Sequence, residues 1–302
     1  MFTLVQLSDP HLGPLPSVRW RQLASKRIFG YVNWHRNRAA DLGPKNLRVL
    51  VDELLDRPRD HIAVTGDLIN IGLSPEIDAA AEWLAALGAP TDVTAVPGNH
   101  DAYLPSAIRH YEKTWQPYMI GDDHGDAPVV FPFTRIRGPV AIVGLSSAIA
   151  TGPLMATGRI RQPQADRLEA ELKRLGEAGL FRVVLIHHPP AIGSAPWHRR
   201  LIGASHFRRA MKSAGAELVL HGHNHHTTVD RIDGPSGPIP VIGASSASLP
   251  PRHGRHGGSY LTFRIAAANR GFECDMEERG TRDDGGVIET LTEERLVGPG
   301  VT

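Results

Sequence analysis

Five short motifs rich in Asp, Asn and His constrain the fold most strongly, because each directly follows a short β-like run. The motifs are "DPH" (9–11), "GD" (66–67), "GNHD" (98–101), "HHPP" (187–190) and "HGHNHH" (221–226). In open α/β sheets, ligands collect beyond the carboxyl ends of the strands, where loops can aim several side chains at one point. We therefore expect an α/β protein with one polar site at a sheet edge.

The pattern of apolar residues supports this class. Strand-like runs occupy residues 2–8, 61–66, 92–98, 139–147, 182–188, 216–222 and 239–245. Apolar residues at helical spacing predict helices over 44–57, 74–87, 163–175 and 206–214. This alternation of strands and helices is typical of α/β layers with buried sheets.

Composition excludes several classes of protein. Hydrophobic residues make up 41% of the 302-residue chain, which is enough for a sizeable core. The net charge is only +1, so no overall basic character predicts a nucleic-acid partner. A lone cysteine, Cys274, rules out an intrachain disulfide and fits a reducing compartment. Without a long apolar run, we expect a cytoplasmic protein that can contact the inner membrane face peripherally.

The polar residues of the five motifs are suited to holding metal ions. They offer carboxylate, amide and imidazole ligands but no thiolate, a set that suits manganese, iron or zinc. Each motif alone, except "HGHNHH", is more often a turn or a polar loop, but all five together at successive strand ends indicate a metal site. The candidate ligands are Asp9, His11, Asp67, Asn99, His187, His223 and His225.

In this order the motifs resemble those of the calcineurin-like metallophosphoesterase superfamily, D-x-H, G-D, G-N-H-[DE], H and G-H-x-H. The resemblance covers roughly residues 1–265 and fills every ligand position. It implies a four-layer αββα sandwich, in which two mixed β-sheets are flanked by helices, with a dinuclear metal centre. On this basis residues 1–265 are the catalytic domain, and residues 266–302 are expected to form a hairpin and an irregular tail packed on it.

The resemblance also implies a role for each ligand. Asp9, His11, Asp67 and His225 would bind one metal ion. Asp67 would bridge to a second ion, completed by Asn99, His187 and His223. The cofactors would be two divalent or mixed-valence ions of manganese, iron or zinc.

Two further histidines, His100 and His188, and one aspartate, Asp101, remain to be assigned. His100 is not a ligand in the family but faces the substrate, and Asp101 is expected to orient it. In "HHPP" either histidine could be the ligand. The commoner family pattern, His-x-Pro, selects His187 and assigns His188 to packing or to substrate binding.

The implied function is that of a dinuclear metal-dependent phosphoric ester hydrolase, most simply a phosphodiesterase. A metal-bridging hydroxide would attack phosphorus in line, and His100 would stabilise charge or protonate the departing alkoxide. The stretch "GDLINIG" (66–72) lacks the arginine with which related protein phosphatases grip a phosphomonoester. The substrate is therefore expected to be a phosphodiester or a pyrophosphate.

A basic, aromatic cap segment (residues 17–40) lies close to the first motif. One interpretation is a solvated cap whose aromatic side chains pack on the domain. The other is a substrate-selecting surface, with Arg27, Trp34 and Arg36 as substrate-binding residues, that contacts a membrane or a lipid substrate. The second interpretation allows an alternative function, a UDP-2,3-diacylglucosamine-type pyrophosphatase at the membrane surface. A metal-poor binding scaffold is a further alternative, against which the full ligand set counts.

Overall fold

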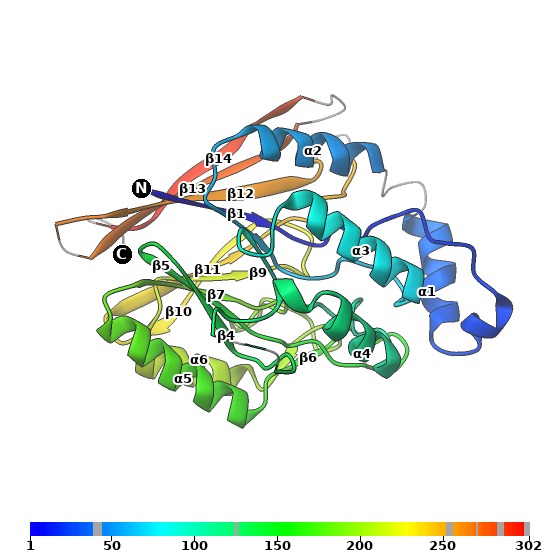
Figure 1. The fold of residues 1–302 in the computed structure, drawn as a ribbon, viewed down its shortest axis with the longest axis horizontal. Coiled ribbons are helices and arrows are strands. Elements are labelled where there is room, and N and C mark those ends of the chain that lie inside the picture. Colours follow the sequence, from blue (N-terminus) through cyan, green and yellow to red (C-terminus); the bar gives the residue numbers. More distant parts are fainter. Residues whose placement is uncertain are drawn as a thin grey trace.

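Two six-stranded β-sheets pack face to face between two layers of helices in the computed structural model of the chain (Figure 1). The structure describes residues 1–38, 44–123, 125, 127–251, 256–269, 271–282 and 287–298. The predicted α/β class, with two mixed sheets between helical layers, is confirmed. The last two residues of the predicted cap segment lie outside the described residues.

The first sheet contains the amino-terminal strand and the carboxyl-terminal strands. Its members are β1 (Phe2–Leu7), β2 (His61–Val64), β3 (Val93–Ala95), β12 (Ser259–Ala267), β13 (Phe272–Thr281) and β14 (Ile288–Val297). The strand order is β14-β13-β12-β1-β2-β3. Strands β1, β2 and β3 pair in parallel, so their carboxyl ends lie at one edge, whereas the other pairings are antiparallel.

The second sheet is formed by the middle of the chain. Its members are β4 (Phe133–Arg137), β5 (Val140–Gly144), β7 (Phe181–Leu185), β9 (Leu218–His221), β10 (Thr228–Gly234) and β11 (Gly237–Gly243). The order is β10-β11-β9-β7-β5-β4, with β5, β7, β9 and β11 parallel. A separate two-stranded ribbon pairs β6 (Gly158–Arg159) with β8 (Leu201–Ile202).

Helices cover the outer face of each sheet. The helical segments among the described residues are η1 (Trp20–Leu23), α1 (Arg27–Asn33), the π-helical turn η2 (Trp34–Arg38), α2 (Pro44–Asp56), α3 (Ser74–Leu87), α4 (Pro105–Thr114), η3 (Gln116–Tyr118), α5 (Gln162–Glu177) and α6 (Ala204–Ala214). Helices α2 and α3 cover the first sheet, and α5 and α6 cover the second (Figure 1). In the described part of the chain, no helix combines the length and the apolar character needed to cross a bilayer.

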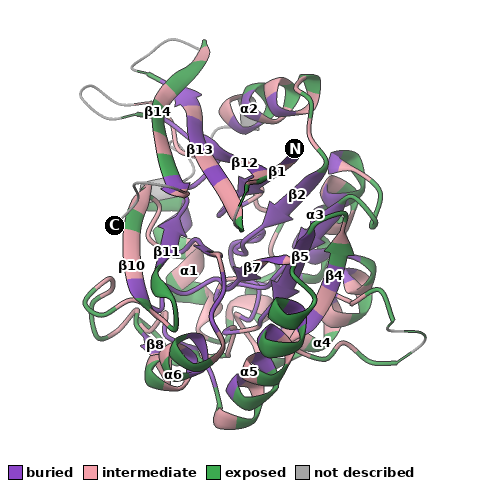
Figure 2. Ribbon diagram, turned by 90° about the vertical axis from the view of Figure 1, so that its left-hand side faces the viewer, coloured by how far each residue is buried: buried purple, intermediate pink, exposed green. Residues whose placement is uncertain are grey.

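Alternating side chains of the strands build three separate cores. In β1, Leu4 lies in the core between the sheets and Val5 in the core beneath the helices of the first sheet. In β7, Val183 lies between the sheets and Val184 packs against the layer of α5 and α6. Successive side chains of a strand point to opposite faces, so both faces of the central strands are buried (Figure 2).

All seven predicted strands and all four predicted helices are present, with ends shifted by a few residues. The expectation of an irregular tail is wrong, because residues 288–297 form β14 at the edge of the first sheet. Most side chains of "IETLTEERLV" are exposed or half-buried, so the strand lacks an apolar signal. Strand β14 is held instead by its backbone hydrogen bonds to β13 and by ion pairs such as the one between Arg295 and Asp275.

A buried arginine ties the two sheets together. Arg135, on edge strand β4, is only 3% exposed. Its guanidinium donates to the carbonyl oxygens of Pro90, Val93, Pro117 and Ile120, which lie just before or at the start of β3 and in or just after η3. Burial lowers its pKa to about 10. The side chain thus supplies buried donors to four backbone carbonyl groups outside its own strand.

Replacing Arg135 with alanine is expected to lower the free energy of unfolding by about 3 kcal/mol, because several carbonyl groups lose a buried donor. Urea unfolding of the metal-free protein, followed by circular dichroism, measures this loss. The matched control is Arg137→Ala on the same strand, whose guanidinium pairs with Asp122 at the surface and should contribute about 0.5 kcal/mol. Equal losses in the two variants would contradict the role assigned to Arg135.

Candidate metal centre

An unusual backbone conformation marks the predicted ligands. Among the described non-glycine residues, six have positive φ, and five of these are predicted metal ligands. They are Asp9 (φ 50°), His11 (41°), Asp67 (54°), His223 (71°) and His225 (61°). Each follows β1, β2 or β9 by a few residues. Such strained conformations cost free energy and cluster at functional sites, so their coincidence with the motifs supports one shared site.

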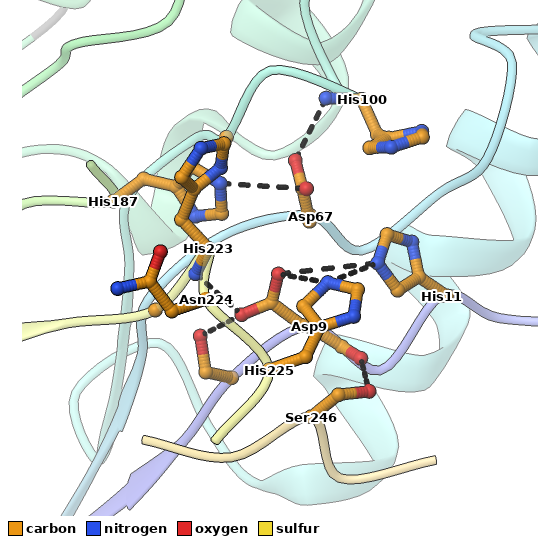
Figure 3. Close-up of polar contacts among 12 residues, drawn as sticks. Asp9, His11, Asp67, His100, His187, His223, Asn224, His225 and Ser246 are labelled. Atoms are coloured by element: carbon orange, nitrogen blue, oxygen red, sulfur yellow. Dashed lines mark hydrogen bonds and ion pairs between the residues drawn. The ribbon is translucent and has the colours of Figure 1, made fainter. Parts of the chain in front are cut away.

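The first ligand group brings together side chains from three loops. Asp9, His11, Asp67 and His225 offer ligand atoms that all lie within 4.8 Å of one another. Oδ2 of Asp9 accepts hydrogen bonds from Ser8 Oγ (2.6 Å) and from the His223 amide (3.0 Å). Its other oxygen, Oδ1, lies 3.1 Å from Nε2 of His225 and 3.9 Å from Nε2 of His11 (Figure 3).

The second ligand group adjoins the first through Asp67. Nε2 of His187 lies 3.4 Å from Oδ2 of Asp67 and 3.2 Å from Oδ1 of Asn99. Oδ1 of Asp67 accepts a hydrogen bond from the His100 amide at 2.7 Å (Figure 3). The ring of His223 lies 5.2 Å from that of His187, centroid to centroid. Asp67 therefore stands between the two groups, as a bridging ligand would.

Backbone carbonyl groups select the tautomers of three of these histidines. The donor nitrogens are Nδ1 of His11 toward Ile69 O (3.2 Å), Nδ1 of His187 toward Thr65 O (2.7 Å) and Nε2 of His223 toward Arg199 O (2.9 Å). A carbonyl oxygen can only accept, so these nitrogens carry the proton in the neutral ring. The opposite nitrogen of each ring is then the one with a lone pair for a metal ion.

The two histidines of "HHPP" differ in this respect. His188 lies near His187 and His223, and the three could form a ligand group by distance alone. However, Nδ1 of His188 is hydrogen-bonded to Ser147 Oγ (2.8 Å) and its Nε2 to the carbonyl of Ala156 (3.2 Å). The geometry therefore favours His187 as the ligand. His188 is completely buried, so this structure does not support its predicted contact with substrate.

The electrostatics of the site favour added positive charge. Burial opposes ionisation of Asp9 and Asp67, but neighbouring histidines hold the pKa of both carboxyl groups below its usual value. Burial likewise opposes protonation of His187, but Asp67 and Asp9 raise its pKa to about 9. Among the described residues, every ion-pair partner of these two carboxylates is a histidine. The carboxylates thus attract positive charge that no lysine or arginine supplies.

The residues of the first ligand group fit a metal ion. Oδ1 of Asp9 is buried without a hydrogen bond, an arrangement that is costly unless another group completes it. Nε2 of His11 and Nε2 of His225 face each other at 3.2 Å, and without a shared proton their lone pairs would repel. A cation between them resolves both features, and the carboxylate, amide and imidazole donors suit manganese, iron or zinc.

Asp101 holds the site together through the backbone. It is fully buried, and its carboxylate accepts hydrogen bonds from the amides of Asp67, Leu68, Ile69 and Gly98. Burial, with the charge of Asp67, raises its pKa to about 7. Asp101 therefore fixes the loops after β2 and β3. This contact differs from the predicted one, in which Asp101 orients the ring of His100.

The ring of His100 is positioned at the edge of the first ligand group. Its Nδ1 donates to the carbonyl oxygen of Asn70, and its ring centroid lies 4.8 Å from that of His11 in an edge-on contact. The side chain is only partly buried, unlike the predicted ligands Asp9, Asp67 and His187. This placement suits a residue that meets a substrate.

Two serines support the site but were missed by the sequence analysis. Ser8 donates to the carboxylate of Asp9, and Ser246 donates to its carbonyl oxygen at 2.7 Å (Figure 3). Ser246 follows β11, at the carboxyl end of a strand like the ligand motifs. The same positional rule could have found it, although serine alone is too common in turns to be a signal.

The predicted substrate-binding residues of the cap segment differ in exposure. The guanidinium of Arg27 donates to the carbonyl groups of Ile71 and Gly72, which anchors the cap to the loop after β2. Trp34 is only 9% exposed. Arg36 alone of the three is exposed to solvent. The structure thus ties the cap to the loop after β2, and of the three predicted residues it buries Trp34, half-buries Arg27 and exposes Arg36.

Comparison with known proteins is consistent with this geometry. The family model for calcineurin-like phosphoesterases matches residues 2–227. Two relatives from Synechococcus, each named a probable cyclic nucleotide phosphodiesterase, are 29% identical to this chain. The alignment with the first covers 57% of this chain and 60% of the relative, and the alignment with the second covers 74% of each. The first of these alignments therefore spans less than two thirds of the relative. The glycerophosphodiester phosphodiesterase GpdQ of Enterobacter lignolyticus is 24% identical over 75% of this chain and 72% of its own.

Solved structures show the same fold at low identity. A dimetal phosphatase from Danio rerio aligns with a TM-score of 0.62 and 18% identity, covering 96% of this chain and 98% of its own. A purple acid phosphatase from yellow lupin aligns with a TM-score of 0.54 and 12% identity, covering 93% of this chain and 54% of its own. At these identities the similarity establishes the fold alone.

Replacing Gly98 with alanine is expected to weaken metal binding by about 10- to 100-fold, because the new Cβ would overlap Oδ1 of Asp67 and displace it. Titration of the metal-free protein with Mn²⁺ measures the change. The matched control is Gly152→Ala, whose Cβ would meet no atom within 4 Å. Unchanged Mn²⁺ affinity in a folded Gly98→Ala protein would show that Asp67 is not a ligand.

Proposed function

The chain belongs to the calcineurin-like phosphoesterase family, and we propose that it is a metal-dependent phosphodiesterase. One observation carries the proposal. Asp67 lies between two convergent groups of ligand atoms, and His100 borders them as a partly exposed imidazole. Such an arrangement suits hydrolysis of a phosphoric ester, in which one phosphoryl group must be held while water attacks.

A phosphodiester is the favoured substrate for two reasons. First, the relatives described above are named for cyclic nucleotides and for glycerophosphodiesters, both of which are diesters. Second, Ile71 stands in "GDLINIG" where related protein phosphatases carry an arginine for the monoester dianion, and it is buried. A diester carries one negative charge on its phosphoryl group and needs less compensation from the protein.

In the proposed mechanism the protein holds the reacting groups and moves one proton. Bound metal ions would supply Lewis-acid charge to the phosphoryl oxygens and lower the pKa of water. The Asn70 carbonyl keeps a proton on Nδ1 of His100, so Nε2 is the atom that would carry the second, transferable proton. Once protonated there, His100 would donate that proton to the leaving alkoxide. Asp101 holds Asp67 in position by accepting hydrogen bonds from the backbone amides of Asp67 and Gly98.

The alternative functions receive less support. No relative reported above is named a lipid nucleotide pyrophosphatase, so nothing in these names favours the UDP-2,3-diacylglucosamine substrate. A metal-poor scaffold is disfavoured because every predicted ligand is present and the side chains converge. The metals are proposed to be manganese, iron or zinc, since the donor set does not separate them.

The protein reconstituted with Mn²⁺ is expected to bind about two ions per chain and to hydrolyse bis(p-nitrophenyl) phosphate faster than p-nitrophenyl phosphate. Elemental analysis and absorbance of released p-nitrophenol measure the two properties. Preference for the monoester would contradict the diester assignment. Fewer than one ion per chain after reconstitution, with no turnover of either ester, would favour the scaffold.

Replacing His100 with alanine is expected to lower kcat by about 10²- to 10⁴-fold, because the leaving alkoxide loses its proton donor. Bound Mn²⁺ should not change, since His100 is proposed to meet substrate and not metal. The matched control is His110→Ala, whose imidazole pairs with Asp78 on the helical surface and should leave kcat unchanged. Loss of metal from His100→Ala would make His100 a ligand and overturn this role.

A further inference from the structure

Exposed apolar side chains gather on three segments that border the metal site. Among the described residues, thirteen large hydrophobic side chains are exposed, and seven of them lie in residues 12–38, 148–160 and 189–203. We call these three segments the rim. The seven side chains are Trp20, Ile28, Phe29, Val32, Leu154, Ile192 and Trp197, exposed by 39% to 85%. Clusters of exposed apolar residues mark interaction surfaces, whereas single ones need no explanation.

Hydrogen bonds join the three segments to one another. Lys26 Nζ donates to the carbonyl of Thr151, which links the first segment to the second. The Ala156 amide donates to the carbonyl of His198, and β6 pairs with β8, which links the second segment to the third. The three segments that carry the seven apolar side chains are therefore connected to one another.

The rim also contacts the ligand loops directly. Nη2 of Arg199 donates to the carbonyl of His223 at 2.6 Å, and the Ala156 carbonyl contacts the ring of His188. On the other side, Gly30 of α1 packs against Tyr103, close after His100 in the chain. Helix α1 lies at the end of the molecule toward which β1 points (Figure 1). The rim thus borders the loops that carry His188, His223 and Tyr103.

The charge of the rim differs sharply from that of the whole chain. The three segments contain nine Arg or Lys residues and no Asp or Glu, although the chain has 33 basic and 32 acidic residues. Arg21 and Arg36 are among its exposed cations. Such a surface is complementary to an anionic membrane. Its cations can contact the lipid headgroups, and the exposed aliphatic and aromatic side chains between them can enter the acyl layer beneath.

We propose that the rim docks on the surface of an anionic lipid bilayer, with the metal site facing the membrane. A second copy of the chain is a poorer partner, because a two-fold contact would press two strongly basic surfaces together. A single-stranded nucleic acid fits less well, since four of the seven side chains are aliphatic and cannot stack on bases as aromatic rings do. The proposal does not depend on which phosphoric ester the site cleaves.

The test is co-sedimentation of the metal-loaded protein with large vesicles. Vesicles that contain phosphatidylglycerol should bind the protein, pure phosphatidylcholine vesicles should bind it much less, and added salt should weaken the binding. The variants Phe29→Ser and Trp197→Ser should each lower the partition coefficient about tenfold, because each removes a large apolar group from the contact. A blue shift of tryptophan emission on binding gives a second readout, lost on replacing Trp20 and Trp197.

The control variants are Val130→Ser and Val287→Ser, whose side chains are exposed by 51% and 73% but lie outside the rim. They should bind vesicles as the parent protein does. Failure of the parent protein to bind anionic vesicles would overturn the proposal, as would an equal loss in rim and control variants. A dimer in sedimentation velocity that dissociates in the Phe29→Ser variant would assign the surface to self-association instead. Hydrolysis of a water-soluble diester, measured in parallel, reports on the proposed function separately.

Discussion

Two buried carboxylates, Asp9 and Asp67, whose ion-pair partners among the described residues are all histidines, are the constraint on which the rest of the site depends. An isolated buried charge is too costly to persist, so the surroundings must compensate it. Imidazole rings, backbone amides and a site suited to metal ions compensate the negative charge of these two carboxylates. The ligand loops adopt left-handed conformations to bring those groups together. Because such loops would relax alone, Asp101 and the close approach of Gly98 to Asp67 hold them in place.

The layered fold makes this arrangement possible. Parallel pairing within each sheet puts the ends of β1, β2 and β3 at one edge and the ends of β7 and β9 at another. The core between the sheets brings the two edges together, so that Asp9 from the first sheet accepts the amide of His223 from the second. A metal centre shared by both sheets therefore depends on the same apolar contacts that stabilise the fold.

Local sequence predicted the parts whose signal is local. Buried strands such as β7 are short apolar runs, and the ligand motifs stand directly after them, so strand, turn and ligand could be inferred together. The remainder depends on contacts distant in sequence. Strand β14 is mostly charged and is held by pairing with β13. The choice of His187 over His188 follows from hydrogen bonds made by Ser147 and Ala156, which no spacing rule contains. Asp101 likewise accepts from amides 32 to 34 residues away.

The metal site and the rim are under different physical constraints. The ligand positions follow strands whose two faces are both buried. A register shift of one residue in such a strand would turn all of its core-facing side chains to the opposite face. The rim consists largely of loops and short helices, with exposed side chains such as Trp197 that contribute little to any core. Substitutions of these exposed side chains can change what approaches the candidate site while leaving the hydrogen bonds between the rim and the ligand loops in place. A fold can therefore be common to a large family while the substrate differs. In this chain the segments that border the candidate site are basic and carry exposed apolar side chains.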